Sequence, residues 1–227
     1  MTVLLLVRHG MTSVTGSKLT GWAPGFHLSE EGRVQAERVG ERLVELPLRA
    51  IYCSPLERCR ETAEPLARRT RLSVRVRPRL GEVRYGDWTG RSLAQLRRTK
   101  LWRRVQLTPS NVRFPGGESF LEVQERAVDE VLRISESHPD AAVAAVSHAD
   151  VIKLVLAHFA GMHQDAFQRL VVDPGSVSVL SIADGFARVV TMNNTGDLAH
   201  LVPRTGRARA AKPAVHRGRP SGRQVRG

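Results

Sequence analysis

The sequence predicts an α/β protein, a three-layer α/β/α sandwich with a mostly parallel central sheet. Apolar stretches of strand length alternate with stretches of helical periodicity, which is typical of a sheet with helices on both faces. The runs at residues 3–7 and 141–146 are apolar without alternation, as expected for strands buried on both faces. A chain of 227 residues is long enough for one such domain with a full core.

The first predicted element is the strand at residues 3–7. A helix follows, because Ser29 is a good N-cap and two glutamates come directly after it, where they favour the positive end of the helix dipole. Pro47 closes this helix. Its predicted buried face carries Val34, Val39, Leu43 and Leu46.

The next strand is the short apolar run at residues 50–53. Ser54 and Pro55 fit the N-cap and first position of a second long helix, in which Pro65 predicts a kink. A third strand is expected around residues 72–78.

The second half of the chain starts with an irregular insertion at residues 91–117, which contains short helical pieces and is expected to lie over one end of the sheet. A helix at residues 118–136, the strand at 141–146 and a helix at 151–161 follow. Residues 176–192 predict a hairpin that turns at Asp184 and Gly185. The predicted buried face of the 118–136 helix carries Leu121, Val128, Val131 and Leu132.

The charge of the chain is uneven. Of the formal net charge of +13, eight charges fall in residues 203–227, which contain no acidic residue and little that is apolar. Such a composition cannot form a core, so we expect one domain at residues 1–202 and a disordered basic tail at 203–227. The remaining charge of the domain suits a pocket for anionic substrates as well as a surface for polyanions.

The chain shows no run long enough for a membrane helix and no signal peptide, so we expect it in the cytoplasm, without a membrane span. Its two cysteines, Cys53 and Cys59, are therefore expected to be reduced, partly buried thiols rather than a disulfide. No spacing of histidines and cysteines resembles a zinc site, and no metal is predicted.

Two junctions in the sequence, "LLLVRHG" and "VAAVSHAD", share one construction: a buried strand, a histidine at its carboxyl end, and a turn. Because ligands bind at the carboxyl ends of parallel strands, we expect His9 and His148 to face one crevice. Arg8 precedes His9, and Arg58 lies in the helix after the second strand. The guanidinium fork matches phosphate oxygens two at a time, and helix N-termini add backbone donors. These four side chains predict a phosphate pocket.

Over residues 2–202 the sequence resembles the histidine phosphatase superfamily, the phosphoglycerate-mutase-like proteins. The resemblance rests on motifs in the family's order: "LVRHG", "LTGW", "LSEEGRVQA", "SPLERCRETAEPLA", "LGEVRYGDWTG", "FPGGES" and "VSHADVIK". The stretch at residues 158–180 is similar to an actinobacterial branch usually labelled probable phosphomutase. The phosphoglycerate-mutase-like fold that the resemblance implies agrees with the predicted layers.

The resemblance implies that His9 is the nucleophile, which takes the phosphoryl group as a phosphohistidine that water then hydrolyses. Arg8, Arg58 and His148 would hold the phosphate oxygens and stabilise the charge in transfer. Nearby arginines and helix N-termini should lower the pKa of His9 below the usual value of about 6.5, which keeps the imidazole neutral at pH 7.

The leaving alkoxide needs a proton, and the family match places the proton donor at Glu82. Asp87 and Asp150 are rivals, and Asp150 has the alternative role of a helix N-cap. In a distant branch of the superfamily the acid directly follows the second histidine, where this chain has Ala149. Glu82 is therefore the preferred acid, with a pKa raised by burial or by the phosphate charge.

Several positions depart from the family pattern or fit it loosely. Thr15 stands where relatives commonly have asparagine, so its phosphate contact is in doubt. Thr20 and Gly21 of "LTGW" are candidate substrate contacts, with packing and turn formation as the alternatives. Ala149 stands where relatives of this branch often have glycine, and its methyl group would narrow the pocket wall.

The predicted function is a metal-independent phosphatase that hydrolyses phosphate monoesters of a small phosphorylated metabolite and needs no cofactor. Two alternatives stay open: a phosphomutase that returns the phosphoryl group to a second hydroxyl, and a polyanion-binding scaffold with an idle pocket. A homodimer is frequent among relatives. Nucleic acid is not required for the predicted function, although the basic tail would suit a polyanion.

Overall fold

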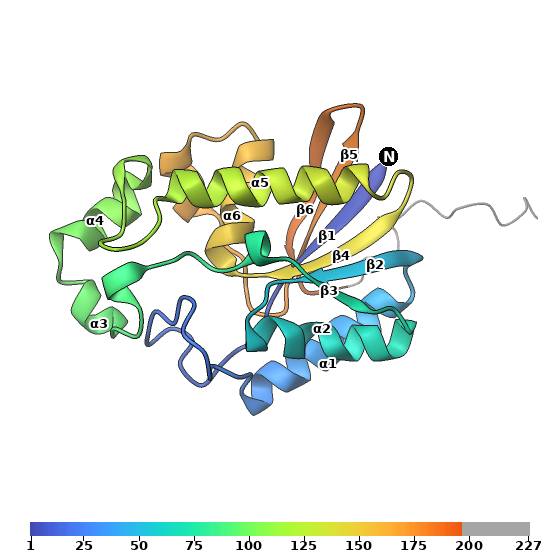
Figure 1. Ribbon diagram of the computed structural model, residues 1–227, viewed down its shortest axis with the longest axis horizontal. Helices are drawn as coiled ribbons and strands as arrows, with labels where there is room; N and C mark the ends of the chain where they lie inside the picture. The colour runs from blue at the N-terminus through green and yellow to red at the C-terminus, as the bar shows by residue number, and fades with distance from the viewer. Residues whose placement is uncertain (197–227) are drawn as a thin grey trace, which may run out of the picture.

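The computed structural model describes residues 1–196 and shows a six-stranded sheet between two layers of helices (Figure 1). The strand order is β3-β2-β4-β1-β5-β6. The first four strands run parallel to one another, whereas β5 is antiparallel to β1 and to β6. The predicted mostly parallel sheet is confirmed. The strands are β1 (Thr2–Arg8), β2 (Leu48–Cys53), β3 (Val74–Val76), β4 (Ala142–Ser147), β5 (Val177–Ala183) and β6 (Phe186–Asn194).

Helices cover both faces of the sheet, which confirms the three layers (Figure 1). Alternate side chains of β1 point to opposite faces: Leu5 and Val7 pack with α1 and α2, whereas Leu4 and Leu6 pack with α5 and α6. The α-helices are α1 (Glu30–Val44), α2 (Glu57–Thr70), α3 (Leu93–Leu96), α4 (Lys100–Leu107), α5 (Phe120–Glu136) and α6 (Ala149–Phe159). Short 3-10 turns are η1 (Pro78–Leu80), η2 (Gly86–Trp88), η3 (Pro109–Asn111) and η4 (Gln164–Arg169).

The start of α2 differs from the prediction. The helix begins at Glu57 with Leu56 as N-cap, so Ser54 and Pro55 precede it. Instead of capping the helix, Ser54 contacts His148: its hydroxyl lies 2.8 Å from Nε2 of the imidazole ring. Pro65 lies inside α2 without ending it.

The predicted buried faces of two helices were partly wrong. Val34 of α1 and Leu121 of α5 are each about half exposed. In α1 the buried face includes Gly32, Ala36 and Gly40. Gly40 lies against α2, where a Cβ would come within 3.1 Å of the backbone of Pro65, and Gly32 lies against the backbone of Met11. These close approaches turn Val34 toward solvent.

The insertion predicted at residues 91–117 contains α3, α4 and η3, as expected. It packs on the core through Trp102, whose ring stacks on that of Trp88 with centroids 6.3 Å apart. The insertion lies beside the carboxyl ends of the parallel strands (Figure 1).

The β5–β6 hairpin turns at Asp184 and Gly185, both with positive φ, which confirms the predicted turn.

Cys53 and Cys59 are free thiols, as predicted, but both are fully buried rather than partly buried. Burial raises the pKa of Cys53 to about 11, so its thiol is protonated at neutral pH. Within residues 1–196, no helix combines the length and apolar character needed to cross a bilayer. The predicted basic tail at 203–227 lies outside the described residues.

Candidate active site

His9 and His148 lie side by side because their strands are parallel neighbours. Arg8, the last residue of β1, pairs with Ser147, the last residue of β4, so the two histidines leave the sheet at the same edge. The backbone N–H of His9 donates to the carbonyl of Ser147 at 3.0 Å. The two rings meet edge to face with centroids 5.2 Å apart. The predicted convergence of the two imidazoles is confirmed.

Arg58 comes to the same place as the second residue of α2, directly after the neighbouring strand β2. Its side chain is 1% exposed. Nη2 donates to the carbonyl of Gly21 at 3.0 Å and lies 3.3 Å from Nδ1 of His148. The guanidinium of Arg8 is held by the backbone, because its Nη1 donates a hydrogen bond to the carbonyl of Val172 at 2.7 Å.

Each of these two arginines keeps one buried nitrogen without a partner. Nη1 of Arg58 and Nε of Arg8 find no hydrogen-bond acceptor within residues 1–196. A buried N–H of a charged guanidinium is costly to leave unpaired, so such atoms are rare outside functional sites. Both guanidiniums line one pocket, which points to an anion as the ligand.

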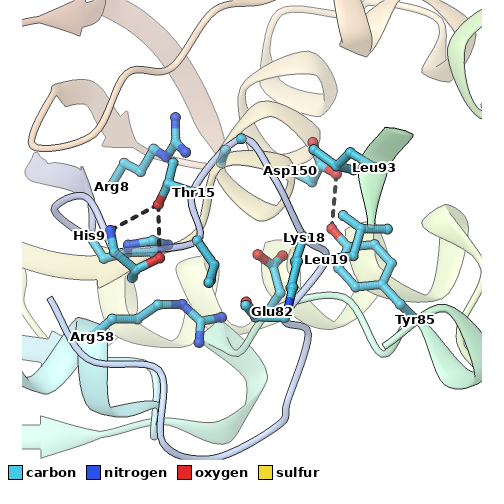
Figure 2. A pocket seen from close by; sticks show the side chains of 15 residues that line it. Arg8, His9, Thr15, Lys18, Leu19, Arg58, Glu82, Tyr85, Leu93 and Asp150 are labelled. Carbon is cyan, nitrogen blue, oxygen red and sulfur yellow. Dashed lines mark hydrogen bonds between the residues drawn. The ribbon is translucent and has the colours of Figure 1, made fainter. Parts of the chain in front are cut away.

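The pocket has a volume of about 160 Å³ and is shown in Figure 2. We call it the phosphate pocket. His148 does not line this pocket, contrary to the expectation that both histidines face one crevice and hold the phosphate: its ring is fully buried beside that of His9. The pocket is lined by Arg8, His9, Thr12, Val14, Thr15, Gly16, Lys18, Leu19, Thr20, Arg58, Glu82, Tyr85, Leu93, Ala149 and Asp150.

The ring of His9 is oriented for attack through Nε2. Nδ1 lies 2.7 Å from the carbonyl oxygen of Gly10, and because a carbonyl only accepts, Nδ1 carries the proton. Burial lowers the pKa of His9 well below its ordinary value, and the charges of Arg58 and Arg8 lower it further. His9 is therefore a neutral imidazole at pH 7 with a free lone pair on Nε2.

His148 is held as a neutral ring by the same reasoning. The guanidinium of Arg58 only donates, so Nδ1 of His148 accepts, and Nε2 donates to the hydroxyl of Ser54. Burial lowers the pKa of His148 well below its ordinary value, and Arg58 adds to the effect. Nδ1 also lies 3.6 Å from a carboxyl oxygen of Glu82. His148 thus connects Arg58, Ser54 and Glu82.

Glu82 lines the phosphate pocket with a carboxyl group suited to exchange a proton near neutral pH. Burial raises its pKa to about 7, and the negative charge of Asp150 adds to the rise against the opposing charges of Arg58 and Arg8. Its backbone carbonyl is fixed by two donors, the indole of Trp22 and the guanidinium of Arg126.

The two rival acids are placed differently. Asp87 is exposed and does not line the pocket. Asp150 lines the pocket but is engaged: its carboxylate accepts from the hydroxyl of Tyr85 at 3.2 Å and pairs with Lys153 at 2.7 Å. The alternative role of Asp150 as N-cap is wrong, because His148 is the N-cap of α6.

Of the positions that depart from the family pattern or fit it loosely, some line the phosphate pocket and others do not. Thr15 and Thr20 line the pocket, but the hydroxyl of Thr15 is bonded within its loop, to the N–H of Thr12 at 2.9 Å. Gly21 does not line the pocket and instead presents its carbonyl to Arg58. The methyl group of Ala149 lies on the pocket wall, as expected.

Sequence reasoning missed several residues that shape the site. Lys18 and Tyr85 line the pocket, Ser54 holds His148, and Trp22 and Arg126 hold the loop of Glu82. Lys18 and Tyr85 carried a weak signal, since Lys18 directly precedes the motif "LTGW" and Tyr85 lies within the motif "LGEVRYGDWTG". Ser54 was assigned to a helix cap, and the contacts of Trp22 and Arg126 depend on tertiary packing.

Within residues 1–196, no cluster of three or more histidine, cysteine, aspartate or glutamate side chains is arranged to bind a metal ion. The parallel sheet, the neutral histidine and the two arginines with unpaired buried nitrogens define a class of proteins that transfer phosphoryl groups through histidine. The family model described as histidine phosphatase superfamily (branch 1) matches residues 4–195. The chain belongs to the histidine phosphatase superfamily, in which catalysis through a phosphohistidine is general.

Individual relatives agree with this membership. The chain is 33% identical over 201 residues to the bifunctional protein Rv2228c of Mycobacterium tuberculosis; the match covers 87% of this chain and 55% of the relative, so the chain spans about half the relative's length. It is 29% identical to the adenosylcobalamin/alpha-ribazole phosphatase of Escherichia coli, with 84% and 95% of the two chains covered. The structure of mycobacterial glucosyl-3-phosphoglycerate phosphatase Rv2419c superposes with a TM-score of 0.78 at 29% identity, covering 85% of this chain and 99% of that one.

Proposed function

We propose that the protein is a phosphatase that hydrolyses phosphate monoesters through a phosphohistidine on Nε2 of His9. One observation carries the proposal. A neutral, oriented imidazole shares a 160 Å³ pocket with two guanidiniums that each keep an unpaired buried nitrogen, and with a carboxyl group whose pKa lies near 7. A nucleophile, an anion clamp and a proton donor are what phosphoryl transfer to histidine requires.

In the first step, the lone pair of His9 Nε2 attacks phosphorus, and the bond between phosphorus and the ester oxygen breaks. The proton of Glu82 passes to the leaving oxygen, so an alcohol departs and Glu82 becomes a carboxylate. Arg8 and Arg58 stabilise the charge on the phosphoryl oxygens during transfer. The hydrogen bond from Nδ1 of His9 to Gly10 stabilises the positive charge that forms on the ring.

In the second step, water attacks phosphorus and the bond to Nε2 breaks, with its electron pair returning to the imidazole. The Glu82 carboxylate takes a proton from the water, which restores the acid for the next cycle. Ser54 and Arg58 keep His148 in place behind the reacting ring. Inorganic phosphate is the second product.

Two relatives matched over most of their length support hydrolysis, since the adenosylcobalamin/alpha-ribazole phosphatase of Escherichia coli and the mycobacterial glucosyl-3-phosphoglycerate phosphatase are both named phosphatases. The mutase and scaffold alternatives make different predictions in one experiment. A panel of phosphorylated metabolites is incubated with the protein in EDTA and scored for free phosphate and for isomerised product. Release of free phosphate would support the phosphatase, and formation of an isomerised product would support the mutase. If no compound is turned over, the result would support the scaffold.

The role of His9 is tested with para-nitrophenyl phosphate and with a radioactive phosphate ester in an acid-labile labelling assay. His9→Ala should abolish both turnover and label. His158→Ala is the matched control, because His158 is exposed and outside the phosphate pocket. Turnover by His9→Ala at the wild-type rate would overturn the proposal.

The setting of the protein is also proposed. A small phosphorylated substrate fits the family. We place the protein in the cytoplasm as a homodimer whose catalytic domain ends at residue 202, with a basic tail that is dispensable for hydrolysis. Cell fractionation, sedimentation and the activity of a chain ending at residue 202 test these three points.

A further inference from the structure

A second cavity adjoins the phosphate pocket. Its volume is about 250 Å³, and it shares with the phosphate pocket a wall formed by four residues: Leu19, Tyr85, Leu93 and Asp150. Figure 2 shows these four side chains together on one side of the pocket, across from His9. We call this space the aromatic cavity. Its remaining lining comes from the core and from the insertion: Trp88, Trp102, Val105, Gln106, Phe114, Phe120 and Gln168.

The lining of the aromatic cavity suits an apolar ring system. Trp88 stacks on Trp102, and Phe114 meets both Trp88 and Phe120 edge to face, so a cluster of aromatic rings forms the cavity's inner wall. The carboxylate of Asp150 is already paired with Lys153 and Tyr85. An apolar cavity of roughly 150 Å³ holds one benzene ring, so a cavity of 250 Å³ holds a larger group, about two fused rings.

The geometry of phosphoryl transfer directs the leaving group to this cavity. Attacking and leaving atoms lie on opposite sides of phosphorus. In Figure 2 the carboxyl group of Glu82 lies between His9 on one side and Leu19 and Tyr85 on the other. The alcohol that Glu82 protonates therefore extends away from His9, toward the wall that the two cavities share.

We propose that the aromatic cavity is the leaving-group subsite and that the preferred substrates are phosphate monoesters whose alcohol carries an apolar aromatic group of about two fused rings. The proposal rests on the proposed function of the phosphate pocket. The insertion supplies the outer wall through Trp102 and Val105 of α4, so this insertion determines which alcohol fits. Small polar esters would leave the cavity unfilled.

The test compares naphthylethyl phosphate with ethyl phosphate, two primary alkyl esters with similar leaving groups. The wild-type protein should favour the naphthylethyl ester in kcat/KM by about 100-fold, because burying the naphthyl group removes a large apolar area from water. The matching pair of non-hydrolysable phosphonates should differ in Kd by about the same factor, with a more negative heat-capacity change for the naphthyl compound.

Variants of α4 tie the preference to the aromatic cavity. Val105 is 4% exposed and lines the cavity, so Val105→Phe fills it and should reduce the kcat/KM ratio of the two esters to about one. Leu107→Phe is the matched control, because Leu107 ends the same helix, is 59% exposed and does not line the cavity. It should keep the wild-type ratio.

The outcomes separate the subsite from the proposed function. Equal kcat/KM for the two esters, with His9→Ala inactive, would overturn the subsite while the phosphatase proposal stands. If neither ester is hydrolysed, the metabolite panel decides the phosphatase proposal, and the phosphonates still decide the subsite, since equal Kd values overturn it. A tenfold or larger ratio that survives in Val105→Phe would also overturn it, because the preference would then arise elsewhere.

Discussion

Nη2 of Arg58 lies 3.3 Å from Nδ1 of His148 while donating to the carbonyl of Gly21 at 3.0 Å. The guanidinium is thus fixed between a buried imidazole and the first loop of the chain. Nη2 is engaged in this way, whereas Nη1 is an unpaired buried donor of a side chain that lines the phosphate pocket. The position of this donor depends on both neighbours.

Replacing Arg58 should remove transition-state stabilisation. Arg58→Ala is expected to lower kcat for a phosphate monoester by about 100-fold to 1,000-fold, as for the loss of one oxyanion donor. Arg58→Lys should restore little of the lost activity. A lysine ammonium group lacks the planar, forked set of donors with which arginine can bond the carbonyl of Gly21 and the phosphate at the same time. Steady-state kinetics measure both variants. The exposed Arg60 on the same helix gives the control Arg60→Ala, and a similar loss in that variant would contradict the assignment.

The proton on Glu82 should control the alkaline side of the pH profile. Its folded pKa of about 7 lies above the ordinary value, so the acid form is present below pH 7 and lost above it. For an alkyl phosphate, kcat/KM should therefore fall as the pH rises through about 7. The lowered pKa of His9 keeps the nucleophile neutral to well below pH 6.5, so the acid limb lies lower.

Glu82→Gln should abolish this alkaline limb and lower kcat for alkyl esters by about 100-fold or more, since the leaving alkoxide needs a proton. The loss for para-nitrophenyl phosphate should be much smaller, because its leaving group is stable as an anion. A pH series with both substrates measures the difference. Equal losses for the two substrates would show that Glu82 is not the proton donor.

The charge of Asp150 should be visible in the same profile. Asp150 is the second cause of the raised pKa of Glu82, so Asp150→Asn is expected to move the alkaline limb to lower pH. Asp87→Asn serves as the control, because Asp87 is exposed and outside the pocket. A limb that stays in place in Asp150→Asn would rule out this coupling.

Gly21 should matter for both stability and activity. Its φ of +51° is unfavourable for other residues, and a Cβ would come within 3.2 Å of Thr89 and Tyr85. Gly21→Ala is expected to lower the free energy of unfolding by about 1 kcal/mol or more, measured by urea denaturation, and to lower kcat by moving the carbonyl that holds Arg58.

Gly25 separates these two effects of Gly21→Ala. Its φ is +80°, but a Cβ there would contact nothing within 4 Å. Gly25→Ala should therefore show the backbone strain in the unfolding curve and leave kcat unchanged. An equal fall in kcat for both variants would contradict the role of the Gly21 carbonyl.

The sequence predicted the parts of the site that depend on strand ends. The run before His9 and the run before His148 fit buried parallel strands, and parallel neighbours bring their carboxyl ends to one edge. The order of the layers followed from the same alternation. These predictions succeeded because hydrophobic periodicity acts locally and is visible in one sequence.

The parts that could not be predicted depend on contacts between distant segments. Ser54 fits a helix cap by its position in the sequence, and only the arrival of β4 beside β2 makes it a partner of His148. Likewise, the buried face of α1 turns away from Val34 where Gly40 packs closely on α2 and Gly32 packs on the loop at Met11. Tertiary packing outweighs local preference in both cases.

The central position of β1 in the sheet has a consequence for co-translational folding. β1 is the first strand to be synthesised, yet it lies between β4 and β5, both of which emerge late. Until those strands arrive, the sheet around β1 is incomplete and its edges are unpaired. A nascent chain therefore gains the paired histidines only after β4 has emerged, and a truncated chain that stops before β4 would contain the first histidine motif without its partner.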